Sequence, residues 1–256
     1  MSDRGVPDIE GALGAIAQSR TEDPLAPVTV IAPSRVAALQ LRRRLAAHGP
    51  FAGVRFETLP RLAELLAAGH LAAAGRRPLA RPIGDYLAVE VARESAPPFE
   101  AIRDLPGYAA TLRTVFRRLR AGGIRSSSDV PADGAPRAFA EVLRLFGRFR
   151  QRSEGFYDPE DLYDAATTVV LDGRSAIAAE LGSVYALPPA ARSAGAAAFL
   201  EALAGKGAAF IEVVDAPAQA EALFVLAPDP ASEAREVARE VIAALEEGVA
   251  LDEIGV

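Results

Sequence analysis

Short apolar runs alternate with longer amphipathic segments at the start of this chain and again after residue 182. The apolar runs are continuous, as expected of strands buried on both faces of a parallel sheet. They are Val28–Ile31, Val54–Phe56, Ser183–Leu187, Ala209–Val214, Leu223–Leu226 and a run that begins at Ile254. The amphipathic segments between them predict helices at Ser34–Ala47, Pro60–Ala68, Pro189–Ala204 and Ala231–Glu247. This alternation predicts an α/β fold with right-handed crossovers.

Between residues 76 and 181 the strand-like runs are missing and helical periodicity replaces them. The pattern predicts helices at Ile83–Glu94, Tyr108–Arg120, Arg137–Arg152 and Glu160–Leu171. We therefore expect residues 76–181 to form a helical insertion domain. The α/β domain would then consist of residues 1–75 and 182–220, and residues 221–256 would be the truncated start of a second domain.

Charge is distributed unevenly along the chain. Residues 28–152 carry 21 arginines and ten acidic residues, a net charge of +11, whereas residues 153–256 carry five basic and 19 acidic residues, a net charge of −14. Such asymmetry indicates a region that faces a polyanion beside an acidic region. The alternative is that the arginines occupy ordinary solvated helix faces.

The composition and the amino-terminal sequence indicate in which cellular compartment the protein resides. The chain has no cysteine, so it forms neither disulfides nor thiolate metal sites. The first residues, MSDRGVPDIEG, contain neither the basic nor the apolar segment of a secretion signal. No apolar run approaches the roughly 20 residues of a membrane span. We expect a soluble, cytoplasmic protein that binds no membrane.

Candidate binding residues follow the first two predicted strands. Ser34 follows the first strand and Pro33, and Arg35 lies in the first turn of the next helix, where free N–H groups favour an anion. Thr58 and Arg61 repeat this arrangement after the second strand. Adjacent strand ends are where open α/β sheets bind ligands. For Ser34 and Thr58 the alternative role is helix capping.

Residues for nucleotide hydrolysis are missing from the expected positions. A phosphate-binding loop needs the pattern G-x-x-x-x-G-K-[ST], but the only lysine, Lys206, has no glycine at that spacing before it and no hydroxyl after it. Its Gly-Lys-Gly context is typical of a helix C-cap. An Asp-Glu pair for Mg²⁺ does not follow the strand Ser183–Leu187. The sequence therefore predicts no cofactor and no ATP hydrolysis.

Three carboxylates lie close together in Asp158-Pro159-Glu160-Asp161. A catalytic acid pair is conceivable there, but Asp at the N-cap, Pro at N1 and Asp at N3 are typical of a helix start. The structural interpretation is favoured.

Taken in order, these segments resemble the UvrD-like helicase superfamily. The resemblance covers IAPSRVAALQLRRRL, VRFETLPRLAELL, FYDPEDLYDAA and APDPASEAREVAREVIAALEEGVALDEIGV. It is strongest to AddB-type helicase–nuclease subunits, whose helicase portion is degenerate in many lineages. The resemblance implies a RecA-like (P-loop NTPase-like) parallel sheet that has lost its ATP site, with a helical insertion.

The resemblance also implies a role in DNA-end processing during double-strand-break repair. This region would bind single-stranded DNA and a partner subunit similar to AddA, and the full-length protein would be an exodeoxyribonuclease subunit. The strand-contacting positions map to Ser34, Arg35 and Thr58, and less closely to Arg61. Two alternatives are a protein-docking scaffold that binds no DNA and a small-molecule α/β enzyme.

Overall fold

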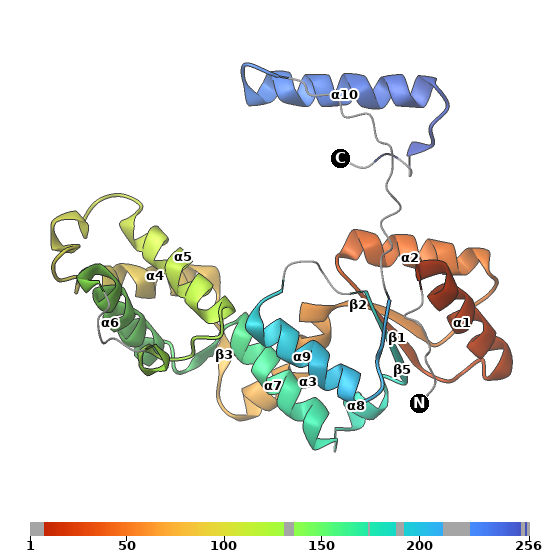
Figure 1. The fold of residues 1–256 in the computed structure, drawn as a ribbon, viewed down its shortest axis with the longest axis horizontal. Helices are drawn as coiled ribbons and strands as arrows, with labels where there is room; N and C mark the ends of the chain where they lie inside the picture. Colours follow the sequence, from red (N-terminus) through yellow and green to blue (C-terminus); the bar gives the residue numbers. More distant parts are fainter. Residues whose placement is uncertain are drawn as a thin grey trace. The chain divides into compact units, whose positions relative to one another are not determined.

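The computed structural model describes residues 8–130, 136–173, 175–187, 192–211, 226–251 and 254. It divides into two compact units, residues 1–213 and 214–256. The first unit contains a four-stranded parallel sheet with strand order β2-β1-β5-β6 (Figure 1). Its strands are β1 (Val28–Ala32), β2 (Val54–Thr58), β5 (Ser183–Ala186) and β6 (Ala209–Phe210). The α/β prediction is confirmed at this level.

Helices cover both faces of the sheet. On one face, α1 (Ile9–Glu22) and α2 (Arg35–Ala47) pack with the side chains of Val28 and Val30. On the other face, Ile31 packs with α3 (Leu59–Ala73), α7 (Pro159–Asp172) and α9 (Ala194–Gly205). Successive residues of a strand point to opposite faces, so β1, all five residues of which are buried, contributes to both layers.

The pairing of β5 with β1 depends on one glycine. Gly182 has a φ of +62°, and a Cβ added there would lie 1.7 Å from the carbonyl oxygen of Pro27. Only glycine combines that backbone conformation with so close an approach. Across the same strands, the Thr29 hydroxyl donates a hydrogen bond to the carbonyl of Leu181 at 2.9 Å. These contacts fix the register in which Val28 lies opposite Ser183.

Three helices form a lobe with a core of its own. They are α4 (Arg81–Ala92), α5 (Tyr108–Ala121) and α6 (Arg137–Arg152), with short 3₁₀ turns at Glu100–Ile102 and Ser127–Asp129. Phe116 lies at the centre of this core, with ring centroids 5.7 Å from Phe146 and 5.2 Å from Phe149. Tilted aromatic pairs at such distances stabilise a core beyond their buried area.

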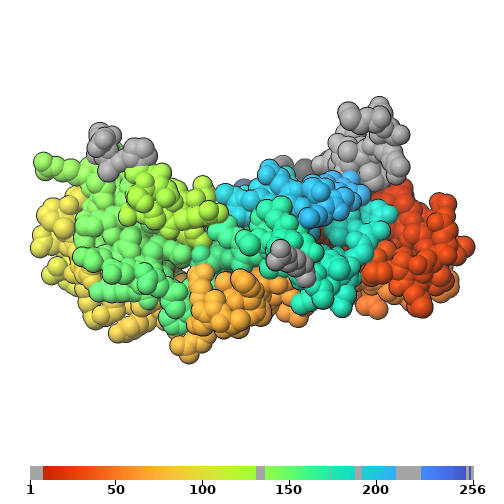
Figure 2. Space-filling view, turned by 90° about the horizontal axis from the view of Figure 1, so that it is seen from below, coloured from red at the N-terminus to blue at the C-terminus, as the bar shows by residue number. Residues whose placement is uncertain are grey.

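The expected insertion of residues 76–181 is divided between two cores. Helices α4, α5 and α6 share the aromatic core, but α7 packs against α3 and α9 through Tyr163, Ala166 and Val170. Figure 2 shows the segments of α3 (orange) and α7 (teal) beside the helical lobe. Two short parallel strands, β3 (Arg77–Pro78) and β4 (Phe156–Tyr157), pair at the boundary. By packing, the helical lobe spans α4 to α6, and α7 belongs with the sheet.

Several element boundaries differ from the prediction. The helix α1 was not predicted, and α3 continues to Ala73 rather than Ala68. The helix α9 begins at Ala194 instead of Pro189, because Ser193 caps it by accepting a hydrogen bond from the N–H of Ala196 at 3.2 Å. The expectation that strands are missing from 76–181 was wrong at β3 and β4, whose two-residue length leaves no periodic pattern. The predicted strand at 223–226 and the end of the one at 209–214 lie largely outside the described residues.

The second unit contains α10 (Pro230–Glu246). Asp229 caps this helix by accepting a hydrogen bond from the N–H of Ser232 at 2.8 Å. The predicted strand that begins at Ile254 lies outside the described residues, apart from Ile254 itself. Among the helices that the structure describes, none is both long enough and apolar enough to cross a membrane.

Candidate nucleic-acid interface

The carboxyl ends of β1 and β2 meet at one edge of the sheet. The two strands are parallel, and Ala32 lies opposite Thr58 in the register. Ser34 is the second residue after β1, and Thr58 is the last residue of β2. The two strand ends that the sequence singled out are therefore neighbours, because parallel strands present their carboxyl ends together.

Ser34 has a structural role in this arrangement. Its hydroxyl oxygen accepts a hydrogen bond from the N–H of Ala37 at 3.1 Å and caps α2. This bond satisfies one of the free donors at the start of the helix. The capping alternative for Ser34 is thus observed, and the next residue, Arg35, begins the helix in an exposed position.

Helix α2 and the end of β2 enclose an open hollow of about 330 Å³, which we call the α2–β2 hollow. Arg35, Thr58 and Arg61, three of the four expected residues, line it, whereas Ser34 does not. Its complete lining is Arg35, Ala38, Leu39, Arg42, Phe56, Glu57, Thr58 and Arg61. Three guanidinium groups and one carboxylate therefore surround one depression, which gives it an excess of positive charge.

The three arginines of the hollow differ in their partners. Arg61 forms an ion pair with Glu64, with 2.6 Å between Nη1 and Oε2, and this carboxylate raises the pKa of Arg61 above its ordinary value. Arg35 and Arg42 are exposed, and neither forms an ion pair or a side-chain hydrogen bond within the part of the chain that the structure describes. Two guanidinium groups are thus available to an anionic ligand. Each offers five N–H donors in a geometry that suits phosphate.

Thr58 contributes a hydroxyl that α3 does not use. It occupies the N-cap position, but its side chain makes no capping hydrogen bond. Pro60, within the first turn of α3, has no N–H, so one of the usual donors of this helix start is missing. The capping role is therefore not observed for Thr58, and its oxygen remains available within the hollow.

Five lining residues of the hollow were not expected from the sequence, and two of them, Arg42 and Phe56, have side chains that suit a nucleic acid. Arg42 is not among the expected binding residues, yet it lines the depression together with Arg35. The signal was present, because residues seven apart lie on the same side of an α-helix. Phe56 also lines the hollow and is only half-buried, since β2 lies at the edge of the sheet. A partly exposed aromatic ring beside arginines is a common feature of single-strand binding sites.

A second group of arginines lies where the helical lobe meets the sheet, at the lobe joint. Arg120 donates from Nε to Asp158 Oδ2 and from Nη2 to Asp161 Oδ1, both at 2.8 Å. Arg150 approaches the same two carboxylates at 3.2–3.4 Å, and Arg76 Nη2 donates to Asp161 at 2.8 Å. The side chain of Arg120 is only 6 % exposed. These guanidinium groups join α5 and α6 to the start of α7.

Burial and neighbouring charges shift the pKa values of the residues in this network in opposite directions. Burial alone would raise the pKa of Asp161, but the N–H of Asp158 and the charges of Arg150 and Arg120 hold that pKa below its ordinary value. Burial would lower the pKa of Arg120, yet Asp158 and Asp161 raise it. Asp158 and Asp161 also form the predicted capping box of α7. The structural interpretation of these carboxylates is therefore confirmed.

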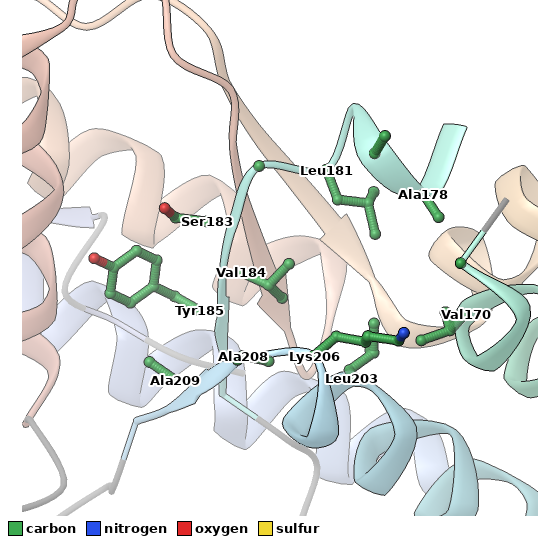
Figure 3. Close-up of a pocket in the computed structure, with 14 residues that line it drawn as sticks. Val170, Ala178, Leu181, Ser183, Val184, Tyr185, Leu203, Lys206, Ala208 and Ala209 are labelled. Carbon is green, nitrogen blue, oxygen red and sulfur yellow. The ribbon is translucent and has the colours of Figure 1, made fainter. Parts of the chain in front are cut away.

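Another cavity, of about 510 Å³, lies beside the amino-terminal half of β5 (Figure 3). Apolar side chains such as Val170, Val184 and Leu203 line part of it, and Lys206 is its basic member. Lys206 also ends α9 as its C-cap, as the Gly-Lys-Gly context predicted. Ligands of open α/β sheets bind at the opposite, carboxyl ends of the strands. This cavity is therefore the weaker candidate, and the α2–β2 hollow is the stronger one.

No protein-family model matches this sequence, and no curated protein is significantly similar to it. A functional proposal for this chain therefore rests on its fold and on the residues of the α2–β2 hollow.

Proposed function

We propose that this chain binds single-stranded DNA in the α2–β2 hollow. It would be the non-catalytic helicase-like region of a DNA-end-processing helicase–nuclease subunit. In this proposal the α/β unit is a RecA-like domain that has lost its ATP site, and a partner subunit similar to AddA supplies the motor. The protein would act in the cytoplasm during double-strand-break repair.

One observation carries the DNA-binding part of the proposal. Arg35 and Arg42 flank the carboxyl ends of two adjacent parallel strands and have no ion-pair partner among the described residues. Phosphate contacts by such groups supply most of the affinity of sequence-independent binding. The Thr58 hydroxyl adds a hydrogen-bonding group, and Phe56 adds an aromatic surface. The hollow thus combines the chemical groups that suit a single strand.

Fluorescence anisotropy with a labelled single-stranded oligonucleotide tests this proposal. We expect micromolar or tighter binding to the wild-type chain, with affinity that falls steeply as salt rises. The variant R42E should lose affinity by about tenfold or more, because it removes one phosphate contact and adds a repulsive charge. The matched control is R43E, which changes the charge of the same helix by the same amount at a residue outside the lining of the hollow.

Three results would contradict the proposal. Equal losses in R42E and R43E would indicate attraction to overall charge rather than binding in the hollow. If the wild-type protein does not bind the oligonucleotide at low salt, the result would instead favour a role as a protein-docking scaffold. ATP hydrolysis above background would refute the claim that the motor is inactive.

A further inference from the structure

The lobe joint contains a cavity of about 410 Å³ that is separate in its lining from the α2–β2 hollow. Its walls come mainly from α5 and α6 of the helical lobe and from the start of α7, a helix that packs against the sheet. We call it the joint cavity. Arginine is the commonest residue in its lining, with Arg113, Arg117, Arg118, Arg120 and Arg150.

Only two of these arginines are available to a ligand. Arg113 is paired with Asp85, with 2.6 Å between Nη1 and Oδ1, and the buried network of the lobe joint engages Arg120 and Arg150. Arg117 and Arg118 are exposed and have no ion pair or side-chain hydrogen bond within the described ranges. Both line the joint cavity, which therefore has two exposed cations without an ion-pair partner among the described residues.

The floor of the joint cavity is apolar. In its lining, Leu79 is half-buried, whereas Phe116, Phe146 and Phe149 belong to the lobe core, and no more than 7 % of any of these rings is exposed. The carboxylates in the lining are Asp158, which the ion pairs of the lobe joint engage, and Glu160. A small inorganic anion would contact the arginines and leave this surface in water. An apolar ligand would contact the floor and leave the cations unmatched. The combination suits a ligand that joins a negative group to a flat, weakly polar ring.

We propose that the joint cavity is a second binding site for the same single strand. Arg117 and Arg118 would contact backbone phosphate, and a base would cover the apolar floor. This inference rests on the function proposed above and gives it a second, separate point of contact. Stacking or apolar contact with a base tolerates any sequence, because every base has a π-face. The site would therefore add affinity without adding sequence preference.

The experiment combines affinity measurement with photo-crosslinking on the complete chain. The variant R117E/R118E is compared with R81E/R137E, which makes the same change of charge on the helical lobe outside the cavity lining. An oligonucleotide that carries a photoreactive thymine analogue is crosslinked to each protein, and mass spectrometry locates the attachment. R117A/R118A removes the same contacts without introducing repulsion, and circular dichroism verifies that each variant is folded.

We expect R117E/R118E to bind about tenfold more weakly than R81E/R137E. The negative slope of log affinity against log salt should become shallower by about 1.4 in R117A/R118A, because each phosphate contact with a single strand contributes about 0.7 to its magnitude. Crosslinks within α5 should appear in the wild type and disappear in R117E/R118E. A purely structural role for these residues would not produce such crosslinks.

The possible results separate the two proposals. If R42E weakens binding, R117E/R118E behaves like its control and no crosslink maps to α5, the joint cavity is not a binding site and the α2–β2 hollow remains one. If R117E/R118E weakens binding and R42E does not, the joint cavity is the binding site and the hollow is not. If the wild-type chain shows no salt-dependent binding, both proposals are wrong.

Discussion

The α2–β2 hollow and the ion-pair network of the lobe joint both contain several arginines, but the arginines have opposite roles in the two places. In the hollow, Arg35 and Arg42 are exposed and have no ion-pair partner among the described residues. At the lobe joint, Arg120 and Arg150 contact the same two carboxylates, and Arg120 is buried. A guanidinium group that is already paired and buried holds the protein together. One that is exposed and unpaired is available to a ligand.

This difference changes how the charge of the chain is interpreted. The net charge of +11 over residues 28–152 counts both kinds of arginine alike. Part of that excess is neutralised by Asp158 and Asp161, which lie just beyond residue 152 and belong to the acidic part of the sequence. The sequence boundary between basic and acidic regions is therefore an ion-pair contact in the folded protein. Local availability of a cation, rather than net charge, decides where a polyanion binds.

The largest expected effect is on stability at the lobe joint. Replacing Arg120 by methionine should lower the free energy of unfolding by about 3 kcal/mol, because it leaves buried carboxylates without one of their partners. Arg150 and Arg76 remain in contact with them, which keeps the loss toward the lower end of the usual range. Urea unfolding of the complete chain measures this change.

The matched control for that prediction is R118M on the same helix. Arg118 is exposed and unpaired in the described part of the chain, so its loss should change stability by no more than about 0.5 kcal/mol. The comparison between the two kinds of arginine fails if R118M destabilises the chain as much as R120M does.

A second prediction concerns the loss of stability at acidic pH. The pKa of Asp161 is lowered in the folded state by the N–H of Asp158 and by Arg150 and Arg120, against the opposing effect of burial. A lowered folded pKa contributes stability that is present above the unfolded pKa, about 3.9 for Asp, and is lost as pH falls through the folded pKa. We therefore expect the urea midpoint to fall steeply below about pH 4.

The variant D161N tests the origin of that acid sensitivity. It should be less stable than the wild type at neutral pH, and its stability should vary less between pH 4 and pH 2 than that of the wild type. Glu141, whose pKa Arg144 lowers, should preserve part of the slope. The variant R42M, which is altered only in the hollow, should show the same dependence of stability on pH as the wild type. An unchanged slope in D161N would contradict the assigned role of the joint.

Local patterns were sufficient to predict the elements around the hollow. The strand Val28–Ala32 and the helix Arg35–Ala47 were found within one or two residues, because a continuous apolar run and a capping serine are signals that neighbouring residues provide. The helix Ile9–Glu22 carries a similar signal that was overlooked. Its buried residues Ala12, Leu13 and Ile16 have helical spacing.

Long-range partners could not be predicted in the same way. The capping box of Asp158 and Asp161 is local and was predicted, but Arg120 lies 38 residues from Asp158 in the sequence and nothing marks it as the partner. The assignment of α7 to the helical insertion followed from its sequence neighbours. Its apolar side chains instead face α3 and α9, and a single sequence does not encode that choice in its periodicity.

The smallest expected effects distinguish the two hydroxyls at the strand ends. Ser34 caps α2, so S34A should cost about 1 kcal/mol of unfolding free energy, measured by urea titration. Thr58 makes no capping hydrogen bond, so T58A should leave stability nearly unchanged and weaken oligonucleotide binding by only about threefold, equivalent to one modest hydrogen bond. If T58A instead destabilised the chain as much as S34A and left binding unchanged, Thr58 would be structural. The available groups of the hollow would then be Arg35 and Arg42 alone.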